Sequence, residues 1–238
     1  MSVVVMFFAI IAGLAGWWLA RQRLTVKPWL EQGVIEGVPD FQLSRDPAKR
    51  VGLAFFLAVV GALFALLTGA YFMRRELGDW QPLPVPPILW ANTVVLVLSS
   101  VALEWTQHAV RRSDIGRVRI GIVASGLLAI AFLAGQLVAW QELSASGYLV
   151  ASNPANSFFY LVTGLHGLHI LGGLVALGWL AIKAWGRGTA DGSVETVRLN
   201  VELCTTYWLF MLFVWMVLFS LLAGWASEFV EFCRQLLS

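Results

Sequence analysis

Charged residues are scarce in this chain. Asp, Glu, Lys and Arg make up 13% of its 238 residues, whereas hydrophobic residues make up 59%. An ordinary soluble domain has about 25% charged residues, so this chain lacks the polar surface that would keep it in water. We therefore expect a membrane protein. The net charge of +2 is also too small to indicate a nucleic-acid partner.

Cysteine and histidine are rare as well, which limits the metal sites that the chain can form. The two cysteines, Cys204 and Cys233, do not form a CxxC pair and cannot make a zinc or iron–sulfur site alone. His166 and His169 share one helix face, a spacing that could hold a metal or haem, but the third histidine, His108, is expected far from them. We therefore expect two structural histidines and no metal or cofactor bound by this chain.

Six apolar segments bounded by charges are long enough to cross a bilayer, which takes roughly 20 residues each. The sequence thus predicts an all-α, polytopic membrane helical bundle of six transmembrane helices. The first segment is expected to be a retained anchor, because Arg21 and Arg23 follow it and no basic residue precedes it. The segments are about 3–20, 51–73, 88–106, 119–140, 157–185 and 199–225.

Lys and Arg are distributed unevenly over the predicted loops. Thirteen of the sixteen lie in the loops after the first, third and fifth segments, and three lie on the opposite side. Cytoplasmic loops retain positive charge during insertion. The distribution therefore predicts that both termini face outward.

Four predicted helices place polar side chains at a similar depth in the membrane. With no water in the bilayer, such groups should face a helix partner or a cavity. The layer is either a network of hydrogen bonds that joins the helices or a path for substrate or protons. Uncharged amides and hydroxyls transfer no protons on their own, which favours the first interpretation. The residues are Thr68, Asn92, Thr93, Gln136, Thr163 and His166.

Two acidic residues lie at the cytoplasmic ends of predicted helices. An intramembrane carboxylate such as Glu202 is by default a candidate for handling protons. Near a helix N-terminus, however, a carboxylate is also stabilised by the helix dipole and free N–H groups. Both interpretations stay open for Glu202, whereas Glu104 is expected to be structural.

Two stretches of sequence carry a family resemblance. The stretch SFFYLVTGLHGLHILGG (157–173) resembles the F-F-x-x-T-G-x-H-G-x-H-x-x-x-G signature of subunit III of haem-copper cytochrome c oxidases. The stretch VELCTTYWLFMLFVWMVLF (201–219) resembles that family's E-x-x-x-x-Y-W-H-F-V-D-x-x-W helix. Weaker matches are GAYFMRR (69–75), PPILWANTVVLVLSS (86–100) and GQLVAWQEL (135–143). The resemblance implies a subunit III-like five-helix membrane domain at 51–238. Residues 1–50 fall outside the resemblance and are expected to form a transmembrane anchor and a basic cytoplasmic loop, from their apolar run and their charges.

The resemblance also implies a function. Family members pack on subunit I, which carries haem and copper, and are thought to hold phospholipids, protect subunit I during turnover and assist proton uptake. The implied partners are subunit I, subunit II, small subunits and membrane phospholipids in an aa3-type oxidase of the bacterial inner membrane. The residues expected to serve packing or lipid binding are His166, His169, Glu202, Tyr207, Trp208, Trp215, Asn92, Gln136 and Thr163.

The sequence departs from the family pattern at several positions that are acidic in relatives. Leu212 stands where the last helix has Asp, and Val60 and Ala139 stand where many relatives have Glu. Leu209 replaces a His. A proton-collecting role is therefore expected to be weaker than the packing and lipid roles, and Glu202 is the remaining candidate. Alternatives are the related subunit of a quinol oxidase or nitric oxide reductase, or a membrane assembly or scaffold protein.

Overall fold

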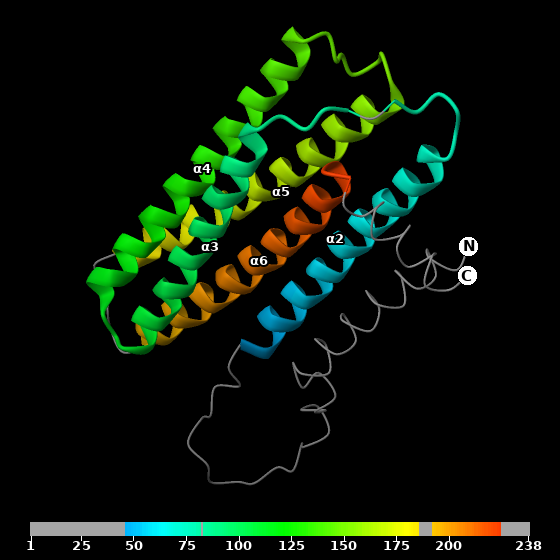
Figure 1. Cartoon of the computed structure of the whole chain (residues 1–238). Helices are drawn as coiled ribbons and strands as arrows, with labels where there is room; N and C mark the ends of the chain where they lie inside the picture. Colours follow the sequence, from blue (N-terminus) through cyan, green and yellow to red (C-terminus); the bar gives the residue numbers. More distant parts are fainter. Residues whose placement is uncertain (1–45, 82, 186–191, 225–238) are drawn as a thin grey trace, which may run out of the picture. The chain divides into compact units, whose positions relative to one another are not determined.

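The computed structural model describes residues 46–81, 83–185 and 192–224. Within these ranges the chain forms helices and no strand, which confirms the all-α prediction there. The segment 3–20, predicted as the first transmembrane helix, lies outside the described residues. The helices are α2 (Asp46–Arg75), α3 (Ile88–Arg111), α4 (Ile115–Ala145), α5 (Pro154–Trp185) and α6 (Gly192–Leu222) (Figure 1).

All five helices are long and apolar enough to cross a membrane. They contain 24 to 32 residues. At a rise of about 1.5 Å per residue they are about 36 to 48 Å long, which exceeds the roughly 30 Å of bilayer hydrocarbon. Their ends therefore reach past the hydrocarbon and include charged residues such as Arg111 and Arg117. For this reason the helices begin earlier or end later than the segments that charges delimit in the sequence.

A tight turn joins α3 to α4. Helix α3 begins directly after Pro87, and a proline costs no hydrogen bond at a helix start. After Arg111 the chain reverses at Ser113, whose φ of 57° lies in the left-handed region. The Asp114 side chain then accepts a hydrogen bond from the Arg117 backbone N–H at 3.1 Å, which caps the start of α4. The two helices are therefore antiparallel neighbours.

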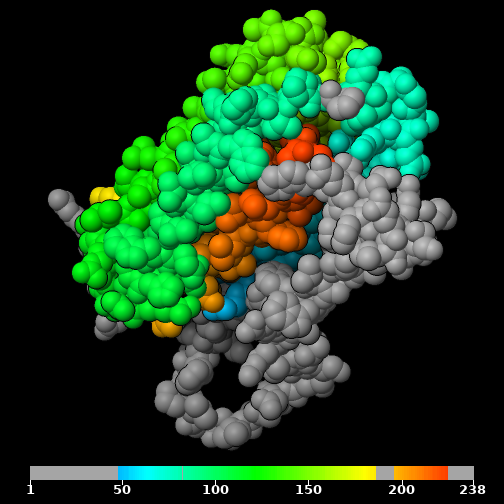
Figure 2. Space-filling view, viewed as in Figure 1, coloured from blue at the N-terminus to red at the C-terminus, as the bar shows by residue number. Residues whose placement is uncertain are grey.

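Helices α3 to α6 pack in a closed ring. Helix α3 contacts α4 and α6, and α5 contacts the same two helices. In Figure 2 the surfaces of α3 and α4 form one wall beside the orange surface of α6. Many exposed side chains are apolar too, as expected of helices that face lipid or a partner. The interior is filled by large side chains that are less than 2% exposed, among them Phe132, Phe159, Trp208, Met211 and Trp215.

The chain divides into two compact units, residues 1–65 and 66–238. Of the first unit the structure describes the α2 residues 46–65, in which Leu57, Val60 and Phe64 are buried while Val59 is exposed. This is the spacing of one buried helix face. The predicted division at residue 50 into an anchor and a five-helix domain stays a prediction.

The connection between α2 and α3 is held at two points. Arg74 donates a hydrogen bond from Nη1 to Asp79 Oδ1 at 2.7 Å. Asn153, in the loop before α5, donates from Nδ2 to the carbonyl oxygen of Gln81, also at 2.7 Å. The hydrogen-bonded guanidinium of Arg74 lowers the pKa of the Asp79 carboxyl below its usual value. The part of the connection up to Gln81 therefore lies next to the end of α2 and the loop before α5.

Candidate functional site

The polar side chains predicted to share one layer are all buried in the described chain. Four of the five described helices contribute to this set, and the exposed fraction of each member is 9% or less. The hydrogen bonds of Thr93, Thr163 and His166 run to tryptophan indoles or to backbone carbonyls. The members are Thr68, Asn92, Thr93, Gln136, Thr163 and His166.

Two tryptophans of α6 donate hydrogen bonds to hydroxyl groups of α3. Trp208 Nε1 lies 3.0 Å from Ser99 Oγ, and Trp215 Nε1 lies 3.0 Å from Thr93 Oγ1. Ser99 in turn donates to the carbonyl oxygen of Ser125 in α4 at 2.9 Å. A buried indole N–H without an acceptor is costly, so these bonds fix the rotation of α6 against α3.

A third indole joins α4 to α5. Trp140 Nε1 donates to Thr163 Oγ1 at 3.1 Å, and Thr163 donates to the carbonyl oxygen of Phe159 at 2.6 Å. The ring lies close to Gly164, where an added Cβ would be 3.3 Å from Trp140 Cη2. The small residue on α5 therefore makes room for the large one on α4.

Backbone carbonyls accept the polar contacts between α5 and α6. His166 Nε2 donates to the carbonyl oxygen of Met211 at 3.2 Å. Tyr207 donates from its hydroxyl to the carbonyl oxygen of His169 at 2.6 Å. Gly173 permits this approach, since a Cβ there would be 2.7 Å from Tyr207 Cε1. The His166 ring and the His169 backbone carbonyl thus bond to α6. That these residues serve packing or lipid binding in a complex stays a prediction.

The His166 ring lies in an aromatic cluster. Its centroid is 5.6 Å from that of Phe132 and 5.1 Å from that of Trp215, and the Phe132 and Trp215 centroids are 5.0 Å apart. Within the described parts of the chain, no three or more His, Cys, Asp or Glu residues are grouped so that they could hold a metal ion.

In the part of the chain that the structure describes, the buried amides, unlike the buried hydroxyls and indoles, have polar atoms without a hydrogen-bond partner. Asn92 Nδ2 and both polar atoms of the Gln136 side chain are buried and have no hydrogen-bond partner among the described residues. The Asn92 side chain lies against α4 at Gly135, where a Cβ would collide with Asn92 Oδ1. Because an unmade buried hydrogen bond costs free energy, these amides do not stabilise the ring as the indole contacts do.

The acidic candidates and the positions that depart from the family pattern lie in different surroundings. Glu104 and Glu202 are half-buried on α3 and α6. Val60 and Ala139 are buried, 3% and 0% exposed. Leu209 is exposed, on the outer face of α6.

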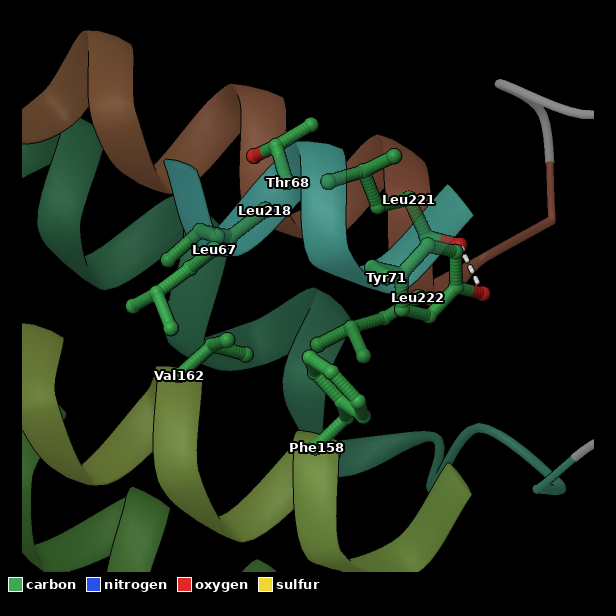
Figure 3. A pocket seen from close by; sticks show the side chains of 8 residues that line it. All are labelled: Leu67, Thr68, Tyr71, Phe158, Val162, Leu218, Leu221 and Leu222. Carbon is green, nitrogen blue, oxygen red and sulfur yellow. Dashed lines mark hydrogen bonds between the residues drawn. The ribbon is translucent and has the colours of Figure 1, made fainter. Parts of the chain in front are cut away.

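A cavity of about 180 Å³ lies where α2, α5 and α6 meet the connection before α3. We call it the loop cavity; its lining residues are Tyr71, Arg75, Trp80, Leu83, Val85, Ala155, Phe159, Leu222 and Gly224. A narrow crevice adjoins it and shares Tyr71 and Leu222. Figure 3 shows this crevice, with Leu67 of α2, Val162 and Phe158 of α5 and Leu218 of α6 among its lining, and the 3.4 Å hydrogen bond from the Tyr71 hydroxyl to the Leu221 carbonyl oxygen.

Sequence reasoning missed two parts of this arrangement. It did not identify Ser99 and Ser125 as hydrogen-bond partners, and it did not find the loop cavity. A signal for the first exists: Trp208 and Trp215 are two helical turns apart and so share one face, which requires two acceptors at matching spacing on a neighbouring helix. No pattern in the sequence marks the cavity, since its lining comes from three helices and a loop.

Comparisons with known proteins agree with one another. Residues 48–227 match the family model described as cytochrome c oxidase subunit III. The "Probable cytochrome c oxidase subunit 3" of Mycobacterium bovis is 32% identical over 185 residues, which cover 76% of this chain and 89% of the relative. The "Cytochrome c oxidase subunit 3" of Thermostichus vulcanus is 28% identical over 191 residues, 77% of this chain and 87% of the relative. The protein of the same name from Synechocystis is 30% identical over 179 residues, 73% of this chain and 74% of the relative.

Proposed function

The chain belongs to the cytochrome c oxidase subunit III family, and we propose that it is the non-catalytic subunit III of a bacterial aa3-type haem-copper oxidase. In this role it packs on subunit I, where haem and copper are bound, together with subunit II and small subunits in the inner membrane. It holds phospholipids and stabilises the catalytic core during turnover and proton pumping. The observation that carries the proposal is the family match across the five described helices.

The packing of the bundle supports a structural role. Its interior is closed by its own side chains and by indole hydrogen bonds between helices. Its outer surface presents apolar side chains on α3, α4 and α5, which can face lipid or the helices of a partner. The exposed set includes Val94, Val101, Leu127, Leu168 and Val175.

The interior also contains few groups that could carry protons. Among the described residues its buried polar side chains are hydroxyls, amides and indoles besides His166, and Val60 and Ala139 are buried apolar side chains. Glu202 remains as the acid to which a proton-handling role can be assigned, and that role is part of the proposal. Substitution Glu202→Gln tests it, with Glu104→Gln as the matched control on α3. Unchanged proton pumping and unchanged turnover-dependent inactivation in Glu202→Gln would make the residue structural.

Purification from the native membrane tests the function as a whole. A tagged full-length chain is extracted from its own host in mild detergent, and the sample is examined for haem, copper and partner subunits. We expect a-type haem and copper to co-purify. A monodisperse chain with no haem-bearing partner would contradict the proposal. A partner with other haems would point instead to a quinol oxidase or a nitric oxide reductase.

A strain that lacks the chain supplies the second measurement. If the subunit stabilises the catalytic core, the oxidase from this strain should lose activity in fewer turnovers than the wild-type enzyme while its initial haem spectrum is unchanged. An equal number of turnovers before inactivation in both strains would remove the stabilising role and leave packing alone.

A further inference from the structure

The loop cavity is lined by three helices and by a connection that hydrogen bonds hold in place. Its roof is the connection between α2 and α3, with Trp80, Leu83 and Val85 facing inward. The hydrogen bonds from Arg74 to Asp79 and from Asn153 to Gln81 hold that roof against α2 and the start of α5. The floor is formed by α5 and the walls by the ends of α2 and α6. The cavity is therefore a fixed hollow in the fold.

Arg75 brings a positive charge to the rim of this hollow. It lines the cavity, is exposed, and has no hydrogen bond or ion pair among the described residues, whereas the neighbouring Arg74 is paired with Asp79. The next residue, Glu76, is exposed and does not line the cavity. A guanidinium offers a planar fork of donors that fits the oxygens of a phosphate group. The rim can therefore accept an anionic group.

The rest of the lining fits hydrocarbon. A cavity of about 150 Å³ with an apolar lining is enough to hold benzene. The loop cavity, at about 180 Å³, can therefore take part of one acyl chain. Three aromatic side chains, Tyr71, Trp80 and Phe159, line it, with the Tyr71 and Trp80 ring centroids 5.1 Å apart. Such rings, apolar with a polar edge, suit the boundary between headgroups and acyl chains.

We propose that one membrane phospholipid binds at the loop cavity, with its phosphate on the Arg75 guanidinium and part of one acyl chain inside. The proposal rests on the lipid-holding part of the proposed function and assigns it a specific place. A free phosphate ion would leave the apolar lining unused. A carboxylate from a partner subunit would pair with Arg75 but would not fill the hollow.

The test uses the purified full-length chain, in its complex where one co-purifies. The probe is a phosphatidylglycerol that carries a photoreactive diazirine in one acyl chain, and the labelled peptides are identified by mass spectrometry. We expect labels in residues 71–85 and 155–159. Substitution Arg75→Gln should reduce them by about tenfold, the loss expected for a charge-assisted hydrogen bond.

Two further variants keep the test independent of folding. Arg112→Gln removes an exposed arginine at the opposite end of the bundle and should leave the labels unchanged. Ala155→Leu fills the cavity from α5, where Ala155 is 5% exposed, and should abolish the labels although Arg75 is retained. Monodispersity and helix content show that each variant is folded. Unchanged labels in folded Arg75→Gln or folded Ala155→Leu would overturn the proposal.

Competing occupants give different results. A diacylglycerol with the same photoreactive chain but no phosphate should label these peptides weakly, and equal labelling would show that the phosphate is not recognised. Competition by millimolar inorganic phosphate would show a free-ion site. Labelling of the isolated chain but not of the complex would indicate a partner side chain at Arg75. Each of these results overturns the proposal while co-purification of haem, and with it the proposed function, stands.

Discussion

The interface between α3 and α6 and the loop cavity lie in the same bundle but are built in opposite ways. Along α3 and α6, buried indoles meet hydroxyls at 3.0 Å and the interior is filled. Around the loop cavity, a 3.4 Å hydrogen bond from Tyr71 joins α2 to α6, and a hollow of about 180 Å³ remains. Polar groups in the first region bond within the chain, whereas Arg75 in the second has no hydrogen bond or ion pair among the described residues. The filled interface between α3 and α6 therefore stabilises the bundle, while the region around α2 retains a hollow.

The largest effect is expected when a large buried side chain is removed from the interface between α3 and α6. Trp208→Ala removes a side chain that is 1% exposed together with its bond to Ser99. We expect the free energy of unfolding to fall by about 3 to 5 kcal/mol, measured by denaturant titration in mixed micelles.

The matched control for Trp208→Ala is Trp179→Ala. Trp179 is 55% exposed and its ring lies under the Lys183 ammonium. Loss of that contact should cost less than about 1 kcal/mol. Similar losses of stability in the two variants would show that the α3–α6 interface is no more tightly packed than the surface.

Adjacent glycines of α5 provide the second prediction. A Cβ at Gly173 would lie 2.7 Å from Tyr207 and 2.8 Å from Trp208, whereas a Cβ at Gly172 would meet nothing within 4 Å. Gly173→Ala should therefore destabilise the chain by about 1 to 3 kcal/mol through overpacking. Gly172→Ala should be neutral or stabilise it by up to about 1 kcal/mol, because alanine favours helix. Thermal unfolding in detergent distinguishes them, and the opposite order would disprove the close α5–α6 approach.

Two polar residues of similar burial should respond in opposite directions. Thr93→Val leaves the buried Trp215 indole without its acceptor and should cost about 1 to 2 kcal/mol. Gln136→Leu removes polar atoms that have no partner among the described residues and should be neutral or stabilise by about 1 kcal/mol. Both are measured by denaturant titration. A clear loss of stability in Gln136→Leu would show that the amide has a partner, such as bound water.

The smallest effect is expected at the ion pair between Arg74 and Asp79, which lies beside the loop cavity. Because Arg74 lowers the pKa of Asp79, the ionised carboxylate stabilises the connection above its usual pKa. This stabilisation is lost as the pH falls through the lowered value. Backbone hydrogen exchange in residues 76–81 should be slower in the wild type than in Asp79→Asn above about pH 4. The difference should shrink below that pH and disappear only once the pH is below the lowered pKa of Asp79. A difference that persists at low pH, or that extends to the core of α3 to α6, would contradict this account.

The positions of the helices could be predicted from the sequence, because they depend on where apolar residues cluster along the chain. Apolar runs located the five described helices, since each needs enough hydrocarbon to cross a bilayer. Several ends were placed too far inside, because charges were treated as boundaries. In the structure Arg117 and Glu142 lie within α4, whose ends extend past the hydrocarbon.

The contacts of the site could be predicted only in part. Depth along each helix can be counted at about 1.5 Å per residue, and this placed Thr93, Thr163 and His166 at one level. It does not give the rotation of one helix against another, which decides that Thr93 meets Trp215 and that Gln136 meets no partner. The family motifs named Tyr207, Trp208 and Trp215, but their acceptors come from packing that only the structure shows.

The two indole contacts between α6 and α3 span 109 and 122 residues of sequence. During synthesis, α3 to α5 are therefore complete before either indole exists. Until then the Thr93 hydroxyl can already donate within its own helix, to the Leu89 carbonyl oxygen at 2.8 Å. Helix α6 consequently closes the ring last, in a slow step that joins distant parts of the chain. A chain whose translation stops before Trp208 would lack both indole contacts and leave the ring of α3 to α6 open.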